Sequence, residues 1–256
     1  MNNRPIGIFD SGLGGLTVVK ELIKLLPYED IIYLGDTARV PYGTRSKETI
    51  IKFSLSDADF LLKKDVKCIV IACNTASSVA GKTLKNKIKI PVFDVIGPTL
   101  KEALKIKNGK VGVIGTRATI KSGAYKADYS ACCPLLVSFI EEGEIESKAL
   151  KIVINNYLKP LKNKSINVLI LGCTHYPLIE KLIQKEMGKG VKLINPGKSV
   201  SKEVVKYLTE NRLLCDNKLK PSLKFFVTDL TDQFVKTAEM FLGKKLGNTV
   251  KRIELD

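Results

Sequence analysis

The chain has 256 residues, of which 42 are basic and 26 acidic, so its formal charge at neutral pH is +16. A composition that is 45% apolar, with no apolar run long enough to span a bilayer, excludes a disordered tail and a transmembrane protein. The basic residues are mostly lysines spread along the whole chain, which favours a solvated lysine-rich surface over a nucleic-acid interface and is compatible with an anionic small-molecule substrate.

Short apolar runs alternate with helical patterns from the N-terminus onward. The predicted strands cover 6–9, 31–34, 69–72, 92–95 and 111–114, and the predicted helices cover 16–26, 47–62 and 77–87. In the helix over 47–62 the expected buried stripe consists of Ile50, Ile51, Phe53, Leu61 and Leu62. Continuous apolar strands separated by helices predict an α/β fold with mainly parallel sheets that helices cover on both faces.

The second half of the chain repeats the pattern of the first. Gly7–Ser11 aligns with Gly112–Thr116, and Cys68–Asn74 (CIVIACN) aligns with Val168–Thr174 (VLILGCT). Each copy therefore has a strand that ends at a cysteine followed by a polar residue. Ligands of open α/β sheets bind beyond the carboxyl ends of the strands, so two facing copies would place these two cysteines across one cleft.

Cys73 and Cys173 are therefore the candidate reactive thiols. Each lies between a predicted strand and a predicted helix, where free N–H groups and the helix dipole favour a thiolate and could bind a substrate carboxylate. The N-terminus lacks a signal-peptide pattern, which predicts a cytoplasmic protein whose six cysteines are thiols. The other cysteines receive no catalytic role: Cys68, predicted to be structural inside a strand, and Cys132, Cys133 and Cys215.

His175 is the only histidine, and it follows Cys173 by two residues. This position favours an acid–base partner of the thiol over a merely packed imidazole. Asp10 ends the first strand and could play the matching part for Cys73, the alternative being a turn aspartate. A single histidine and the lack of a CxxC motif predict no metal site.

The glycine-rich turn after Asp10 leaves a nucleotide-binding alternative open. Asp36 ends the second strand, roughly where a ribose-binding acid would lie. However, the pattern Gly12-x-Gly14-x-x-Thr17 lacks the third glycine, and no GxxxxGK motif exists in the chain. A nucleotide site would also leave the paired cysteines unexplained.

Together these motifs resemble the glutamate branch of the cofactor-independent aspartate/glutamate racemase family. The matching segments are Ile6–Val18 (IGIFDSGLGGLTV), Tyr33–Gly43 (YLGDTARVPYG), Ala72–Ser78 (ACNTASS), Val113–Tyr125 (VIGTRATIKSGAY), Leu169–Ile179 (LILGCTHYPLI) and Phe225–Leu230 (FFVTDL). His175 indicates the glutamate branch, because the aspartate racemases usually carry a glutamate at this place.

The resemblance implies two pseudo-symmetric α/β domains with the active site in the cleft between them. The first would comprise 1–96 and 207–256, and the second 97–206. It further implies that the protein interconverts L- and D-glutamate without a cofactor, supplies D-glutamate for peptidoglycan synthesis, and works as a cytoplasmic homodimer that binds no membrane.

The resemblance also implies roles for particular residues. Cys73 and Cys173 would be the two catalytic bases, with Asp10 assisting the first and His175 the second. Glu141, rather than its neighbour Glu142, would lie beside the histidine. The implied substrate contacts are Asp10, Ser11, Tyr42, Gly43, Asn74, Thr75, Thr174 and His175, with Thr116 and Thr119 as additional candidates.

Two departures from the family pattern affect these expectations. The segment Lys126–Cys132 is much shorter than usual, which could remove part of a helix and a strand and leaves the position of Glu141 open. Gly97 stands where the family usually has a glutamate, at the expected hinge between the domains, so domain motion could differ.

Two alternative functions remain open from the sequence. A sister enzyme could racemise aspartate, a hydantoin or an arylmalonate. A non-catalytic relative could instead retain the fold and bind a ligand or nucleic acid without turnover. The shortened segment is the feature that favours this second alternative, whereas the intact cysteines argue against it.

Overall fold

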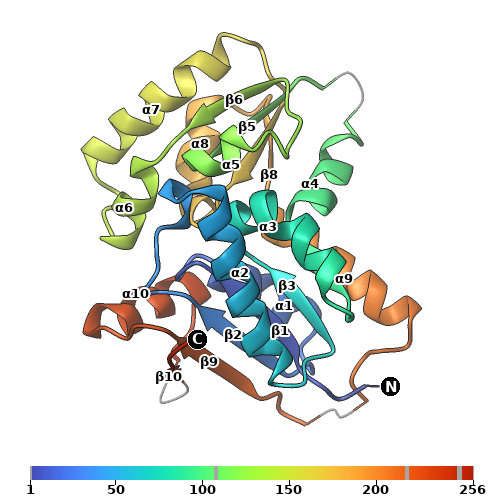
Figure 1. The fold of residues 1–256 in the computed structure, drawn as a ribbon. Helices are drawn as coiled ribbons and strands as arrows, with labels where there is room; N and C mark the ends of the chain where they lie inside the picture. The colour runs from blue at the N-terminus through green and yellow to red at the C-terminus, as the bar shows by residue number, and fades with distance from the viewer. Residues whose placement is uncertain (1, 107–108, 217–218, 247–249, 256) are drawn as a thin grey trace.

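Two parallel sheets form the framework of the computed structural model, which describes residues 2–106, 109–216, 219–246 and 250–255 (Figure 1). Within these residues the first sheet has the strand order β10-β9-β2-β1-β3-β4 and the second the order β6-β5-β7-β8. The strands of the first sheet are β1 (Ile6–Asp10), β2 (Ile31–Gly35), β3 (Cys68–Ile71), β4 (Val92–Asp94), β9 (Leu223–Val227) and β10 (Val250–Arg252). Those of the second are β5 (Val111–Gly115), β6 (Tyr129–Cys132), β7 (Val168–Gly172) and β8 (Lys192–Ile194). The paired strands run parallel throughout both sheets.

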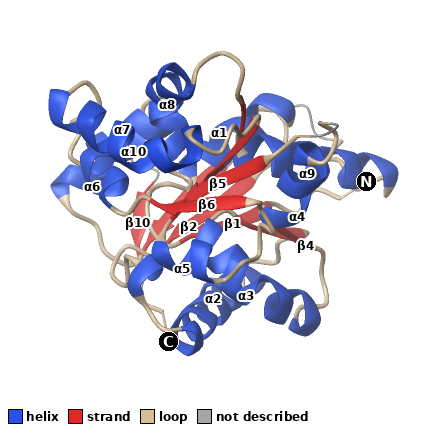
Figure 2. Cartoon of the chain, turned by 90° about the horizontal axis from the view of Figure 1, so that it is seen from above, coloured by secondary structure: helices blue, strands red, loops and turns tan. Residues whose placement is uncertain are grey.

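Helices surround the strands on both faces, as the view from above shows (Figure 2). They are α1 (Leu16–Leu25), α2 (Lys47–Leu62), α3 (Asn74–Lys87), α4 (Ile96–Ala103), α5 (Arg117–Lys121), α6 (Leu135–Glu141), α7 (Lys148–Lys162), α8 (Glu180–Met187), α9 (Pro196–Glu210) and α10 (Asp232–Leu242). Two short 3-10 helices, η1 (Tyr42–Thr44) and η2 (Tyr176–Ile179), lie in loops. None of the helices in the described ranges is long and apolar enough to cross a membrane.

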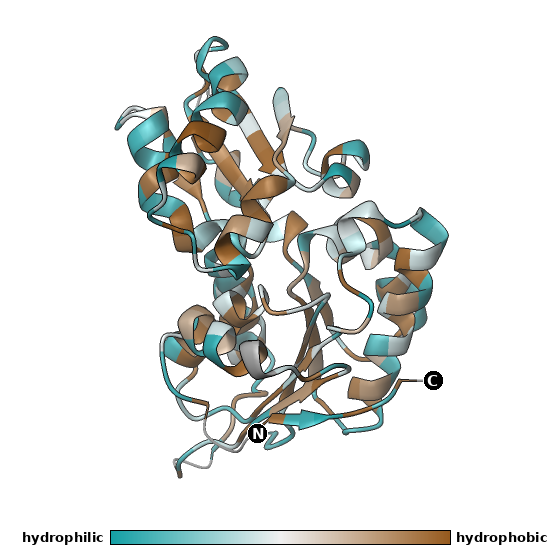
Figure 3. Cartoon of the chain, turned by 90° about the vertical axis from the view of Figure 1, so that its left-hand side faces the viewer, coloured by the Kyte–Doolittle hydropathy of each residue, from teal (hydrophilic) through white to brown (hydrophobic). Residues whose placement is uncertain are grey.

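The central strands are apolar at every position because both of their faces are covered. In β3 the side chains of Cys68 and Val70 join one buried cluster with α1, α9 and α10, while Ile69 and Ile71 join a second cluster with α2 and α3. Alternate strand residues point to opposite faces, so both sets need a helical layer. Colouring by hydropathy shows the same arrangement, with hydrophobic strands inside and hydrophilic helix surfaces outside (Figure 3).

The internal repeat predicted from the sequence is confirmed by the topology. The order β2-β1-β3-β4 of the first sheet corresponds to β6-β5-β7-β8 of the second, with β1 matching β5 and β3 matching β7. The carboxyl ends of β3 and β7 lead into the turns that carry Cys73 and Cys173. The α/β fold with two mainly parallel, helix-flanked sheets is thus the one expected.

The described elements agree with the predicted ones except at one important boundary. The helix predicted from Ser77 begins at Asn74, directly after Cys73. The reason is the cap, because the backbone N–H of Ala76 donates to the sulfur of Cys73 at 3.4 Å. The thiol therefore sits at the first turn of α3 and belongs to its N-cap.

The predicted buried stripe of α2 is wrong in part. Ile50 and Leu61 are buried, but Leu62 is exposed and Ile51 and Phe53 are half-buried. Ser54, Asp57 and Ala58 occupy the inner face instead. A polar residue faces inward because Asp57 meets partners on the loop that follows β2.

Helix α9 connects the two halves of the chain. It packs against α1 beside the first sheet and against α4, which follows the edge strand β4 of that sheet. The expected domain boundary at residues 206 and 207 falls inside this helix, which continues to Glu210. The division into two domains stays a prediction.

The two departures from the family pattern have simple local structures. The short segment Lys126–Cys132 retains a strand, β6, paired with β5, and the helix before it, α5, is only five residues long. Gly97 lies in the first turn of α4, where its N–H donates to the Asp94 carboxylate at 3.0 Å. A side-chain carbon at Gly97 would meet nothing within 4 Å, so packing does not require glycine there.

Candidate active site

The turn after β3 holds Cys73 as a buried, protonated thiol. Cys73 is only 5% exposed, and its S–H donates to the hydroxyl oxygen of Ser11, with the sulfur 3.4 Å from that oxygen. Burial and the nearby Asp10 carboxyl raise the pKa of the Cys73 thiol to about 12, although the contacts with Ser11 and Ala76 lower it. At neutral pH this thiol is therefore a proton donor.

The turn after β7 places Cys173 against a histidine and a glutamate. The Cys173 sulfur lies 3.6 Å from Nδ1 of His175, and Nε2 of His175 lies 2.8 Å from Oε1 of Glu141. Burial lowers the pKa of His175, but its contacts with Cys173 and Glu141 outweigh that effect and raise it to about 10. At neutral pH an imidazolium thus lies beside the sulfur of Cys173.

Glu141, whose position the shortened segment left open, lies at the end of α6 and reaches His175. Its neighbour Glu142 is exposed. The ring of His175 also packs edge-on against Phe241 of α10, with centroids 5.2 Å apart. The histidine is therefore held from both sides, by a side chain from each half of the chain.

Asp10 ends β1 and is buried beneath the glycine-rich turn. Its Oδ2 accepts a hydrogen bond from the N–H of Gly12 at 3.0 Å, and its Oδ1 has no hydrogen-bond partner among the described residues. Burial raises the pKa of Asp10, and the nearby charge of His175 lowers it. Asp10 lies close enough to influence the Cys73 pKa, but the structure shows no hydrogen bond between these two described side chains.

The glycine-rich turn makes a close contact between the two halves. A Cβ atom on Gly14 would lie 2.1 Å from Oγ1 of Thr174 and 2.6 Å from Nδ1 of His175. Thr17, one turn further on, donates from its hydroxyl to the carbonyl oxygen of Thr174 at 2.9 Å. Gly14 is therefore required by the approach of the cysteine-bearing turn of the other half.

The predicted substrate contacts from α3 and α5 also come together. The hydroxyl of Thr75 lies 2.9 Å from that of Thr116 and 3.3 Å from that of Thr119. Gly43 lies beside the same group, because a Cβ built on it would be 2.8 Å from Cβ of Thr116. These residues bridge the first turns of α3 and α5.

Tyr125 is a further candidate site residue, which the sequence does not single out although it lies within the matched segment Val113–Tyr125. Its hydroxyl donates to Oδ1 of Asn74 at 2.5 Å. Burial raises the pKa of Tyr125, and Asp94, Cys173 and Cys73 act in the same direction. Both cysteines therefore lie within electrostatic reach of one phenol.

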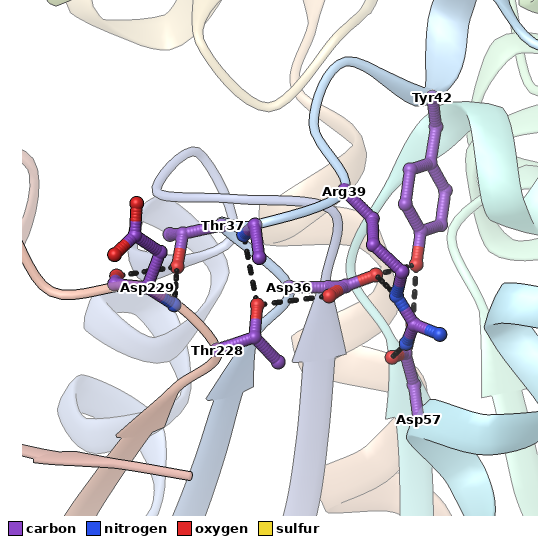
Figure 4. Close-up of polar contacts among 8 residues, drawn as sticks. Asp36, Thr37, Arg39, Tyr42, Asp57, Thr228 and Asp229 are labelled. Carbon is purple, nitrogen blue, oxygen red and sulfur yellow. Dashed lines mark hydrogen bonds and ion pairs between the residues drawn. The ribbon is translucent and has the colours of Figure 1, made fainter. Parts of the chain in front are cut away.

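The Tyr42 side chain does not point toward the other predicted substrate contacts. Its hydroxyl bonds to the carboxyl groups of Asp36 and Asp57 in the interior, so a substrate contact from Tyr42 would have to come from its backbone (Figure 4). Asp36 is itself fully buried and paired with Arg39. The nucleotide alternative is therefore wrong, because no ribose could reach this carboxylate.

The described residues also assemble no group of three His, Cys, Asp or Glu side chains suited to a metal ion.

Replacing Glu141 by glutamine should lower the pKa of His175 clearly below its wild-type value of about 10, because the carboxylate charge that favours the imidazolium is lost. His175 is the only histidine, so its ring signals in a pH titration followed by NMR are unambiguous. The matched control is Glu142→Gln at the exposed neighbouring position, which should leave the titration unchanged. Equal titration curves for wild type and Glu141→Gln would contradict the claim that the Glu141 carboxylate raises the pKa of His175.

Comparison with known proteins agrees with these observations. The family profile described as Asp/Glu/Hydantoin racemase matches residues 6–204. The chain is similar to glutamate racemases of Geobacter metallireducens (42% identical, covering 96% of this chain and 95% of that protein) and Aquifex pyrophilus (47% identical, covering 93% and 94%). It is also similar to the crystal structure of glutamate racemase from Francisella tularensis in complex with D-glutamate, with a TM-score of 0.93, 44% identity, and coverage of 100% of this chain and 99% of that one.

Proposed function

The chain belongs to the Asp/Glu/hydantoin racemase family, and we propose that it interconverts L- and D-glutamate without a cofactor by proton transfer between substrate and the thiols of Cys73 and Cys173. The relatives named glutamate racemase, and the similar structure that holds D-glutamate, support glutamate as the substrate. The observation that carries the mechanism is the pair of cysteine turns, which occupy equivalent places in a repeated fold but differ in their charged neighbours.

Racemisation needs one group that removes the Cα proton from one face and another that delivers a proton to the opposite face. From L-glutamate, the Cys173 thiolate takes the proton, forming an S–H bond while the C–H electron pair stays on the substrate. The Cys73 thiol then donates its proton to the other face and becomes the thiolate. From D-glutamate the same two groups exchange roles. The protonated Cys73 and the imidazolium beside Cys173 support this assignment.

The weak acidity of the Cα proton is the main energetic obstacle. The substrate carboxylate must therefore be stabilised as negative charge develops, which free N–H groups at the start of α3 can do. Cys73 and Cys173 are 5% and 6% exposed, so the reaction would take place where water is largely excluded. We assign the substrate contacts to Asp10, Ser11, Gly43, Asn74, Thr75, Thr116, Thr119, Thr174, His175 and the backbone of Tyr42.

The wider biological role is part of the same proposal. D-glutamate made by this reaction would supply peptidoglycan synthesis in the cytoplasm, and the enzyme would act as a homodimer of two-domain subunits. The first domain would comprise 1–96 and 207–256, and the second 97–206.

Circular dichroism of L-glutamate incubated with the purified protein, without added cofactor, tests the proposal. We expect the signal to decay to zero from either enantiomer, and L-aspartate to change far more slowly. Faster racemisation of aspartate would identify a sister enzyme. Binding of glutamate without any change of its optical signal would indicate a non-catalytic relative.

A further inference from the structure

A buried polar cluster lies behind the candidate active site, between β2, α2 and the loop that joins them. It consists of Asp36, Arg39, Tyr42 and Asp57, and we call it the Asp36–Asp57 cluster (Figure 4). The two aspartates and the tyrosine are at most 1% exposed, whereas the Arg39 side chain is 21% exposed. Burial of two carboxyl groups side by side calls for a physical explanation.

The contacts leave one negative charge too many if both carboxyl groups are ionised. Arg39 lies between them, with Nε 2.6 Å from Oδ2 of Asp36 and Nη2 3.0 Å from Oδ1 of Asp57. This guanidinium is the only cation that the structure shows bonded to either carboxyl group within the described residues. One guanidinium balances one carboxylate, and an unbalanced buried charge is costly.

The count of protons points to the same conclusion. The Tyr42 hydroxyl lies within hydrogen-bond distance of Oδ2 of Asp36 and 2.8 Å from Oδ2 of Asp57. A phenol has a single proton and can donate to only one of two carboxylates. The second contact is therefore a hydrogen bond only if one carboxyl group carries its own proton and donates it to the phenol oxygen.

Asp36 is the better supported carboxylate of the two. Besides Tyr42 it accepts the short bond from Arg39 and a bond from the hydroxyl of Thr228 to Oδ1 at 2.9 Å. Asp57 has the longer contact with Arg39, and no third donor bonds to it among the described residues. Burial and the neighbouring Asp36 raise the pKa of Asp57 well above its ordinary range, more than Tyr42 and Arg39 lower it.

We propose that Asp57 is a neutral carboxylic acid in the working enzyme and donates its proton to Tyr42, which in turn donates to the Asp36 carboxylate. Asp57 and Tyr42 are then positioning residues for the loop over 36–45. The start of this loop is tied to the end of β9, because Thr37 donates to the Asp229 carbonyl oxygen at 2.6 Å and accepts from its N–H at 2.7 Å.

The hydrogen-bond chain fixes the other end of the loop, where the site begins. Tyr42 is followed directly by Gly43, which lies against Thr116. Thr116 in turn contacts Thr75, next to the Cys73 turn. A shift of Tyr42 would therefore move Gly43, Thr116 and Thr75, to which we assign substrate contacts. The expected effect on activity rests on the proposed function.

Two matched substitutions test the inference. Asp57→Asn replaces a neutral acid by a neutral amide that can still donate to Tyr42 and accept from Arg39, so kcat/KM should stay within about threefold of wild type. Asp36→Asn removes the charge that Arg39 needs and should lower kcat/KM by at least about tenfold, mainly through a higher KM. Equal losses in the two variants, or a larger loss in Asp57→Asn, would overturn the proposal.

The pH dependence of stability gives a readout that needs no activity. The titratable groups that act on Asp57 are Asp36, Tyr42 and Arg39. An acid whose pKa is raised in the folded state binds a proton that the unfolded chain has lost, so the contribution of Asp57 to the stability of wild type falls as pH rises above about 4. The Asp57→Asn variant lacks this loss of stability, because its amide does not titrate.

The melting temperature of Asp57→Asn minus that of wild type should therefore rise with pH, by about 3 °C per unit between pH 5 and 7. A difference that falls with pH would show an ionised, paired Asp57 and overturn the proposal. If wild type fails to racemise glutamate but this difference rises, the proposed function is wrong and the neutral acid stands.

Discussion

Replacing either Cys73 or Cys173 by alanine should lower glutamate racemisation by at least about 10³-fold, because each thiol supplies one of the two proton transfers and a positioned acid or base contributes about 10²–10⁴-fold. The two enantiomers have equal free energy, so kcat/KM must fall by the same factor in both directions. The rate of change of the circular dichroism signal, started from each enantiomer, measures this. Cys→Ser at either position should also abolish most activity, and Cys→Ala should be at least as severe.

The other cysteines provide the control for this result. Cys132 is exposed, so Cys132→Ala should keep the activity of wild type. Full activity in either Cys73→Ala or Cys173→Ala would contradict the two-thiol scheme. A loss of activity counts as loss of a catalytic thiol when the far-ultraviolet spectrum and melting temperature of the variant match those of wild type.

Gly14→Ala should lower kcat/KM by about 10²-fold, although no reacting group is changed. The new methyl group would lie 2.1 Å from Oγ1 of Thr174 and 2.6 Å from Nδ1 of His175, so the turn that carries Cys173 must move by about 1 Å. Both turns lie where the two halves meet, so each half can still fold around its own sheet. The measurement is steady-state kinetics of racemisation beside a melting curve.

Gly12→Ala in the same turn is the matched control for this prediction. A Cβ on Gly12 would approach Cγ2 of Val40 at 3.4 Å, an ordinary contact, and the N–H that donates to Asp10 is kept. Its kcat/KM should stay within a few-fold of wild type. Similar losses in both variants would mean that the turn is sensitive to any side chain and would contradict the specific contact with Thr174 and His175.

The local sequence pattern predicts the two parallel sheets and the positions of the two candidate catalytic cysteines, because both features depend on short stretches of chain. Strands such as β3 are apolar at every position, and the repeat of CIVIACN and VLILGCT places Cys73 and Cys173 in equivalent turns. The sequence pattern predicts the start of α3 at Ser77, later than the observed start at Asn74, because cysteine is not among the residues preferred at an N-cap. The N-cap is recognised only in the structure, where the Ala76 N–H donates to the Cys73 sulfur.

Features that depend on contacts between distant segments could not be predicted. Asp57 looks like a surface residue of an amphipathic helix, and its burial depends on Asp36 and Tyr42 from another loop. The glycine at position 14 suggested a nucleotide turn, but its reason lies 160 residues away in the chain, at Thr174. The contact of Glu141 with His175 likewise depends on how β6 pairs with β5 and on how the following helix α6 packs against η2, which comes after β7.

The most direct test of the two-base mechanism is the early time course of racemisation of L-glutamate in D₂O, with the Cα hydrogen of each enantiomer measured by mass spectrometry after chiral separation. The Cys73 thiol exchanges with D₂O before substrate binds, so it delivers a deuteron. The hydrogen that Cys173 removes from L-glutamate stays on that sulfur while substrate is bound, and it can return only to the same face. We predict that newly formed D-glutamate carries deuterium at Cα and that the remaining L-glutamate carries none. Appearance of D-glutamate that retains the original Cα hydrogen, or equal deuterium in both enantiomers from the start, would contradict two separate bases.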